Sequence, residues 1–79
     1  MSKIKRVEDC RTHKEFVRWA TQHGGIVEPG GRHTKVRGPK GGMAPIPNHR
    51  GDLATGTRYS IIKMFVAIGL ACILLLAIV

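Results

Sequence analysis

The residues best suited to acid–base chemistry in this sequence are its histidines, and one of them, His33, stands among cations. His33 follows Gly30-Gly31 and Arg32, and Lys35 and Arg37 come two and four residues after it. An imidazole has an unperturbed pKa of about 6.5, so it can accept or donate a proton near neutral pH. Neighbouring cations can hold a phosphate and stabilise charge that builds on its oxygens. These residue types suit RNA cleavage, although a strand histidine beside basic residues is more often a solvated surface residue.

A second basic pair, His49-Arg50, follows a segment that ends in proline. Two interpretations are open: a polar turn, or a second phosphate or catalytic contact. The glycine-rich segment 38–42 contains Lys40 but lacks the eight-residue spacing and the Lys-Ser/Thr pair of a P-loop. We interpret three further side chains as structural. His13 and His23 are expected near the two ends of the first helix, and Trp19 is expected in the core.

The sequence offers no grouping of residues for a metal or cofactor. It has no Cys-x-x-Cys motif, and Asp52 is the only acid after Glu28, so no carboxylate pair is present to hold a catalytic metal. Any nuclease activity is therefore predicted to be independent of metal and cofactor. Cys10 and Cys72 are interpreted as unrelated reduced thiols, and the charged N-terminus without an apolar stretch predicts a cytoplasmic protein without a signal peptide.

Turn and periodicity signals predict the elements that must position these side chains. Thr12 and Glu15 fit a capping box, so a helix is expected over 12–23. Short β-branched or alternating segments separated by glycine turns predict strands at 26–28, 32–37 and 43–47. A second helix is expected to begin near Thr55 or Thr57, with one of them as N-cap, and to run to about residue 70.

This order predicts an α+β fold, α-β-β-β-α, with a three-stranded antiparallel meander and two helices on one face. A period of two along 32–37 places His33, Lys35 and Arg37 on the solvent face and Thr34 and Val36 toward the core.

Most of the positive charge lies in residues 1–60, the body of the protein, and not in the apolar end of the chain. The 79 residues carry 13 Lys+Arg and 5 Asp+Glu, for a net charge of +8, and 12 of the basic residues lie within 1–60. Such a body calls for an acidic partner: nucleic acid, anionic lipid or an acidic protein. The length excludes a multi-domain enzyme, and a single long apolar run excludes a polytopic membrane protein.

Three regions are predicted: a flexible arm at 1–11, which is polar and mixed in charge, a domain at 12–70 and an apolar extension at 71–79. Of the 19 residues from 61 to 79, 17 are hydrophobic. Residues 61–70 are expected to supply the second helix of the core. The extension is then left to meet a membrane, a partner or a second copy of the chain. A membrane-anchored protein without enzymatic activity is therefore one alternative.

Four motifs in a fixed order resemble the HicA toxin family. They are Gly-Arg-His-Thr-Lys-Val at 31–36, Gly-Gly at 41–42, Pro-Ile-Pro-Asn-His at 45–49 and Gly-Thr-Arg-Tyr-Ser-Ile-Ile-Lys at 56–63. Residues 15–25 are similar to that family's first helix. Two departures stand out: Arg32 occupies a position where Ser or Lys is common, and 71–79 continue beyond the pattern.

The resemblance implies a double-stranded-RNA-binding-like fold and a small basic mRNA interferase that a HicB-type antitoxin neutralises. It implies His33 as the catalytic residue and His49 as a second catalytic or phosphate contact. A non-catalytic RNA-binding module is the second alternative. The residues predicted to bind RNA are Arg32, Lys35, Arg37, Lys40 and Arg50.

Overall fold

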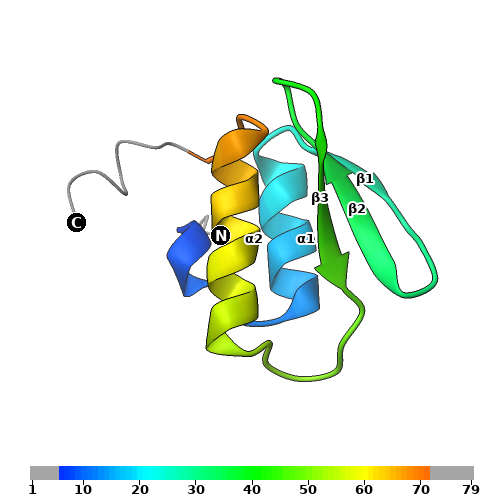
Figure 1. Cartoon of the computed structure of the whole chain (residues 1–79), viewed down its shortest axis with the longest axis vertical. Helices are drawn as coiled ribbons and strands as arrows, with labels where there is room; N and C mark the ends of the chain where they lie inside the picture. Colours follow the sequence, from blue (N-terminus) through cyan, green and yellow to red (C-terminus); the bar gives the residue numbers. More distant parts are fainter. Residues whose placement is uncertain (1–5, 72–79) are drawn as a thin grey trace.

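Residues 6–71 form an α+β fold with two α-helices and a three-stranded antiparallel sheet (Figure 1). The computed structural model describes residues 6–71. The elements in chain order are η1 Val7–Asp9, α1 His13–Gln22, β1 Ile26–Glu28, β2 His33–Arg37, β3 Met43–Pro47 and α2 Thr55–Ala67. The predicted order of helices and strands is confirmed, and β2 begins one residue later than expected.

The sheet is a meander in the order β1-β2-β3, with both pairs antiparallel. Val36 pairs with Val27 on one side and Ala44 on the other, while His33 pairs with Pro47. Burial alternates along β2, where Thr34 and Val36 are buried and the residues between them are exposed. The predicted facing of β2 is therefore confirmed.

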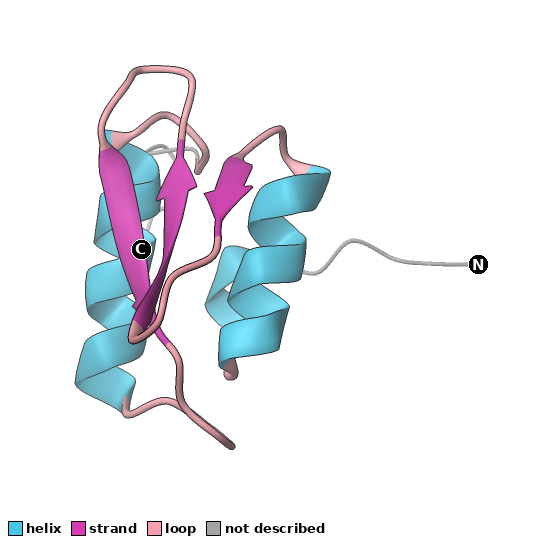
Figure 2. Cartoon of the chain, turned by 90° about the vertical axis from the view of Figure 1, so that its right-hand side faces the viewer, coloured by secondary structure: helices cyan, strands magenta, loops and turns pink. Residues whose placement is uncertain are grey.

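Both helices cover the same face of the sheet, and no helix or strand among the described residues covers the other, open face (Figure 2). The core between them is aromatic at its centre. The Phe65 ring meets the Phe16 ring edge-on at 6.0 Å and stacks with the Trp19 ring at 5.7 Å between centroids. Trp19 is only 6% exposed, so its interpretation as a core residue is confirmed.

Both helices begin near the predicted residues, but only the first has the predicted cap. The Thr12 hydroxyl accepts a hydrogen bond from the Glu15 amide, and the Glu15 carboxylate accepts from the Thr12 amide, which completes the capping box. Helix α2 has Ala54 as its N-cap, without a side-chain hydrogen bond. The expected threonine cap is wrong because Thr55 already lies inside the helix.

Residues 6–11 belong to the folded body, which corrects the expectation of a flexible arm there. Val7 lies in η1 and is 4% exposed, and Cys10 is 1% exposed. The Arg11 carbonyl accepts a hydrogen bond from the amide of Leu53, itself buried, which ties this segment to the start of α2. Burial of these apolar side chains outweighs the polar character on which the arm was predicted.

The far end of the described chain closes the core. Leu70 is 9% exposed, and Ala71 packs against the core with its amide donating to the Phe65 carbonyl. The rest of the predicted extension, 72–79, lies outside the described residues, as do 1–5. No helix within 6–71 combines the length and apolar character that crossing a bilayer requires.

Candidate nucleic-acid interface

His33 opens strand β2 on the uncovered face of the sheet, where its imidazole is exposed. Lys35 stands two residues farther along the same face, also exposed. The Lys35 side chain forms no ion pair or hydrogen bond with another described residue, so its charge is free for a ligand. An accessible imidazole beside an unneutralised ammonium is the arrangement that a phosphate contact needs.

Arg37, the third predicted cation on this face, is committed to a protein partner. Its Nε donates to Glu28 Oε2 at 2.6 Å across the β1–β2 pair. Because both side chains are about half exposed, the bond contributes little stability, but it offsets the positive charge. The open face thus carries its free cation near His33 and a neutralised pair near the other end of β2.

Lys40 lies at the opposite end of the sheet from His33. Its amide donates to the Ile68 carbonyl at the end of α2, and its side-chain stem lies close to Gly69. The structure therefore does not bring Lys40 together with the other predicted site residues. Arg32, by contrast, is exposed directly before His33.

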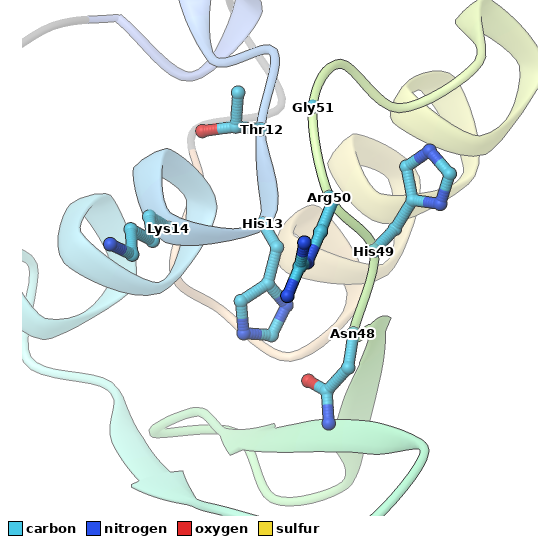
Figure 3. A pocket seen from close by; sticks show the side chains of 7 residues that line it. All are labelled: Thr12, His13, Lys14, Asn48, His49, Arg50 and Gly51. Carbon is cyan, nitrogen blue, oxygen red and sulfur yellow. The ribbon is translucent and has the colours of Figure 1, made fainter.

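A cleft of about 670 Å3 lies on the helix side, between the start of α1 and the loop that joins β3 to α2 (Figure 3). In Figure 3, His13 and Arg50 occupy the middle of the cleft, with Lys14 to one side and His49 projecting to the other. The lining residues are Thr12, His13, Lys14, Asn48, His49, Arg50 and Gly51. The predicted pair His49-Arg50 therefore joins two α1 residues that the sequence did not single out for chemistry.

The cleft is cationic on the basis of its side chains. Lys14, His49 and Arg50 form no side-chain ion pair or hydrogen bond within the described chain. No acidic side chain lines the cleft. The capping box occupies the Thr12 and Glu15 amides at the start of α1, so these two amides are not free to bind an anion. A second hollow of about 510 Å3 shares His13 and Lys14 and extends the basic surface to Arg18.

Asn48 joins the cleft to the turn that presents His33. Its Nδ2 donates to the carbonyls of Gly30 and Gly31, both at 2.9 Å, and its amide donates to the Arg32 carbonyl at 2.9 Å. Three consecutive residues before His33 are thus held by one asparagine. His33 and His49 are close along this path, because His33 pairs with Pro47, two residues before His49. Their Cα atoms lie within roughly 13 Å of each other.

The site residues that sequence reasoning missed are His13, Lys14, Thr34 and Asn48. No group of three His, Cys, Asp or Glu side chains that could hold a metal ion occurs among residues 6–71. No family model, curated protein or solved structure matches this chain. The class of protein that fold and site define is therefore a small basic α+β protein with two cationic surfaces that meet at the end of β3.

Proposed function

We propose that this protein is a HicA-like mRNA endoribonuclease with a double-stranded-RNA-binding-like fold, neutralised by a HicB-type antitoxin. The observation that carries the proposal is the exposed His33 at the start of β2. Unpaired cations lie near it on the open face of the sheet, at Lys35, and in the cleft on the helix side, at Lys14 and Arg50. The α-β-β-β-α order and the sequence motifs support it. The large positive charge supports a polyanionic substrate.

The chemistry needs one proton removed and one supplied. His33 accepts the proton of a ribose 2′-hydroxyl, and the 2′-oxygen attacks the adjacent phosphorus. The bond from phosphorus to the 5′-oxygen breaks, which leaves a 2′,3′-cyclic phosphate and a 5′-hydroxyl. The proton for that leaving oxygen comes from His49 or from water, so no metal enters the reaction.

Cations near the histidines hold the RNA backbone. Lys35 and Arg32 serve the open face, and Arg50 with Lys14 serves the cleft. Each can contact a phosphate without breaking a bond that the fold uses. Arg37 contributes less because Glu28 competes for its guanidinium. An antitoxin that covers this end of the molecule would block both surfaces.

The proposal is tested by replacing His33 with alanine in the full chain. His33→Ala should lower the rate of RNA cleavage in EDTA by about 100-fold or more, because general acid–base groups contribute that much. It should also abolish growth arrest on expression. His23→Ala is the matched control, because His23 stacks on Trp19 at the other end of α1 and should leave the cleavage rate unchanged.

The outcomes separate the competing functions. If His33→Ala cleaves RNA as fast as the original chain, His33 is not catalytic. If the original chain binds RNA with strong salt dependence but leaves it intact, the protein is a non-catalytic RNA-binding module. If toxicity persists without RNA binding, the membrane-active alternative gains support.

A further inference from the structure

Thr34 is a buried polar residue beneath the open face of β2, next to His33. It is 6% exposed, and its side chain points away from the solvent face that carries His33. Its hydroxyl lies 3.0 Å from Asn48 Oδ1 and 3.3 Å from His13 Nε2. A buried hydroxyl that joins two other side chains fixes the relative position of three elements: α1, β2 and the end of β3.

The donors and acceptors of this cluster can be assigned in part. Asn48 Nδ2 faces the carbonyls of Gly30 and Gly31, so its amide cannot be flipped and Oδ1 must accept. The Thr34 hydroxyl therefore donates its single proton to Asn48 Oδ1.

His13 joins the cluster to α1 and to the end of β3. Its Nδ1 lies 2.9 Å from the Pro47 carbonyl oxygen, which can only accept, so Nδ1 donates there. Nε2 of the same ring lies 3.3 Å from the Thr34 hydroxyl oxygen.

We infer that Thr34, Asn48 and His13 form a clamp whose role is to position His33. The clamp holds the three carbonyls that precede His33, through Asn48, and ties them to α1 and β3. Its members are positioning residues, since they act on His33 through the turn that precedes it. This inference rests on the proposed function for its catalytic consequence, but the clamp itself can be observed without RNA.

A matched pair of variants tests the clamp through catalysis. Thr34→Val keeps the shape and removes the hydroxyl, whereas Thr34→Ser keeps the hydroxyl. We expect Thr34→Val to lower kcat at least about tenfold, because a misplaced acid–base group loses its alignment with the reacting atoms. KM should change by less than about threefold, because Lys35 and Arg50 are untouched. Thr34→Ser should restore kcat, which general loss of stability would not explain.

Nuclear magnetic resonance tests the clamp independently of activity. In the original chain, the Asn48 side-chain amide protons should exchange slowly, because Nδ2 donates to two carbonyls. Thr34→Val should shift the backbone amides of residues 30–33 and the His33 ring signals, and Thr34→Ser should not. Unchanged signals in Thr34→Val overturn the inference. Intact clamp signals in a chain that does not cleave RNA would instead overturn the proposed function.

Discussion

Gly30 controls how closely the chain can turn before the candidate catalytic histidine. A methyl group at Gly30 would overlap the carbonyl oxygen of His33, whereas one at Gly31 would meet nothing within 4 Å. We expect Gly30→Ala to destabilise the fold by about 1–3 kcal/mol and to lower RNA cleavage, because the turn must open to admit the methyl. Gly31→Ala is the matched control and should leave both quantities nearly unchanged. Chemical denaturation and a cleavage assay measure them, and equal effects of the two alanines would contradict this role for Gly30.

Single residues also mark how far the site could be predicted. His33 and Lys35 were predicted on the solvent face because strand alternation is a local property, readable over five residues. His13 and Asn48 were missed as site residues because their roles depend on contacts between distant segments. His13 meets Pro47 across 34 positions of sequence, and Asn48 meets Gly30 across 18. The only sequence signal for Asn48 is that a polar residue directly follows Pro47 at the end of β3, and this signal is weak.

The packing of α2 on α1 depends on one aromatic side chain. Phe65 is fully buried and contacts the rings of both Phe16 and Trp19. We expect Phe65→Ala to cost about 3–5 kcal/mol, because the cavity cannot be filled by its rigid neighbours. A domain of this size has only about 5 kcal/mol to lose, so the variant should keep about 0–2 kcal/mol and unfold at a much lower urea concentration. Circular dichroism in a urea titration measures the change.

Tyr59 provides the control within the same helix. It is 62% exposed and packs little, so Tyr59→Ala should change stability by no more than about 0.5 kcal/mol. A folded Phe65→Ala variant with near-original stability would show that the aromatic contacts do not hold α2.

At the level of elements, the sequence predicts a helix start correctly where hydrogen bonds between neighbouring residues determine it. The capping box at Thr12 was recognised because its two reciprocal bonds span only four residues. The cap of α2 was not, because burial of Leu53 and its amide bond to Arg11 decide where that helix begins. The contribution of η1 was missed for the same reason, since the burial of Val7 and Cys10 depends on a core assembled from the whole chain.

At the level of the whole molecule, the candidate site and the contact between the β2–β3 turn and the end of α2 lie at opposite ends. The start of α1, the turn before β2 and the loop after β3 gather at one end, where the free cations and His33 lie (Figure 1). At the other end, the β2–β3 turn meets the end of α2, where a methyl at Gly38 would overlap the Ile68 carbonyl. The unpaired cations of the candidate site therefore lie at the end away from this contact.

This division predicts where the chain can be shortened. Buried residues extend to Leu70, and Ala71 makes the last backbone bond to α2, so a chain ending at Ala71 should keep its denaturation midpoint and its RNA cleavage. A chain ending at Ala67 loses Ile68 and Leu70, which are 4% and 9% exposed, and should be destabilised by about 3 kcal/mol or more. Urea titrations and cleavage assays on both chains provide the comparison. If the chain ending at Ala71 stays folded but loses its toxicity and its membrane fraction, residues 72–79 carry the activity, and the membrane-anchored alternative replaces the ribonuclease.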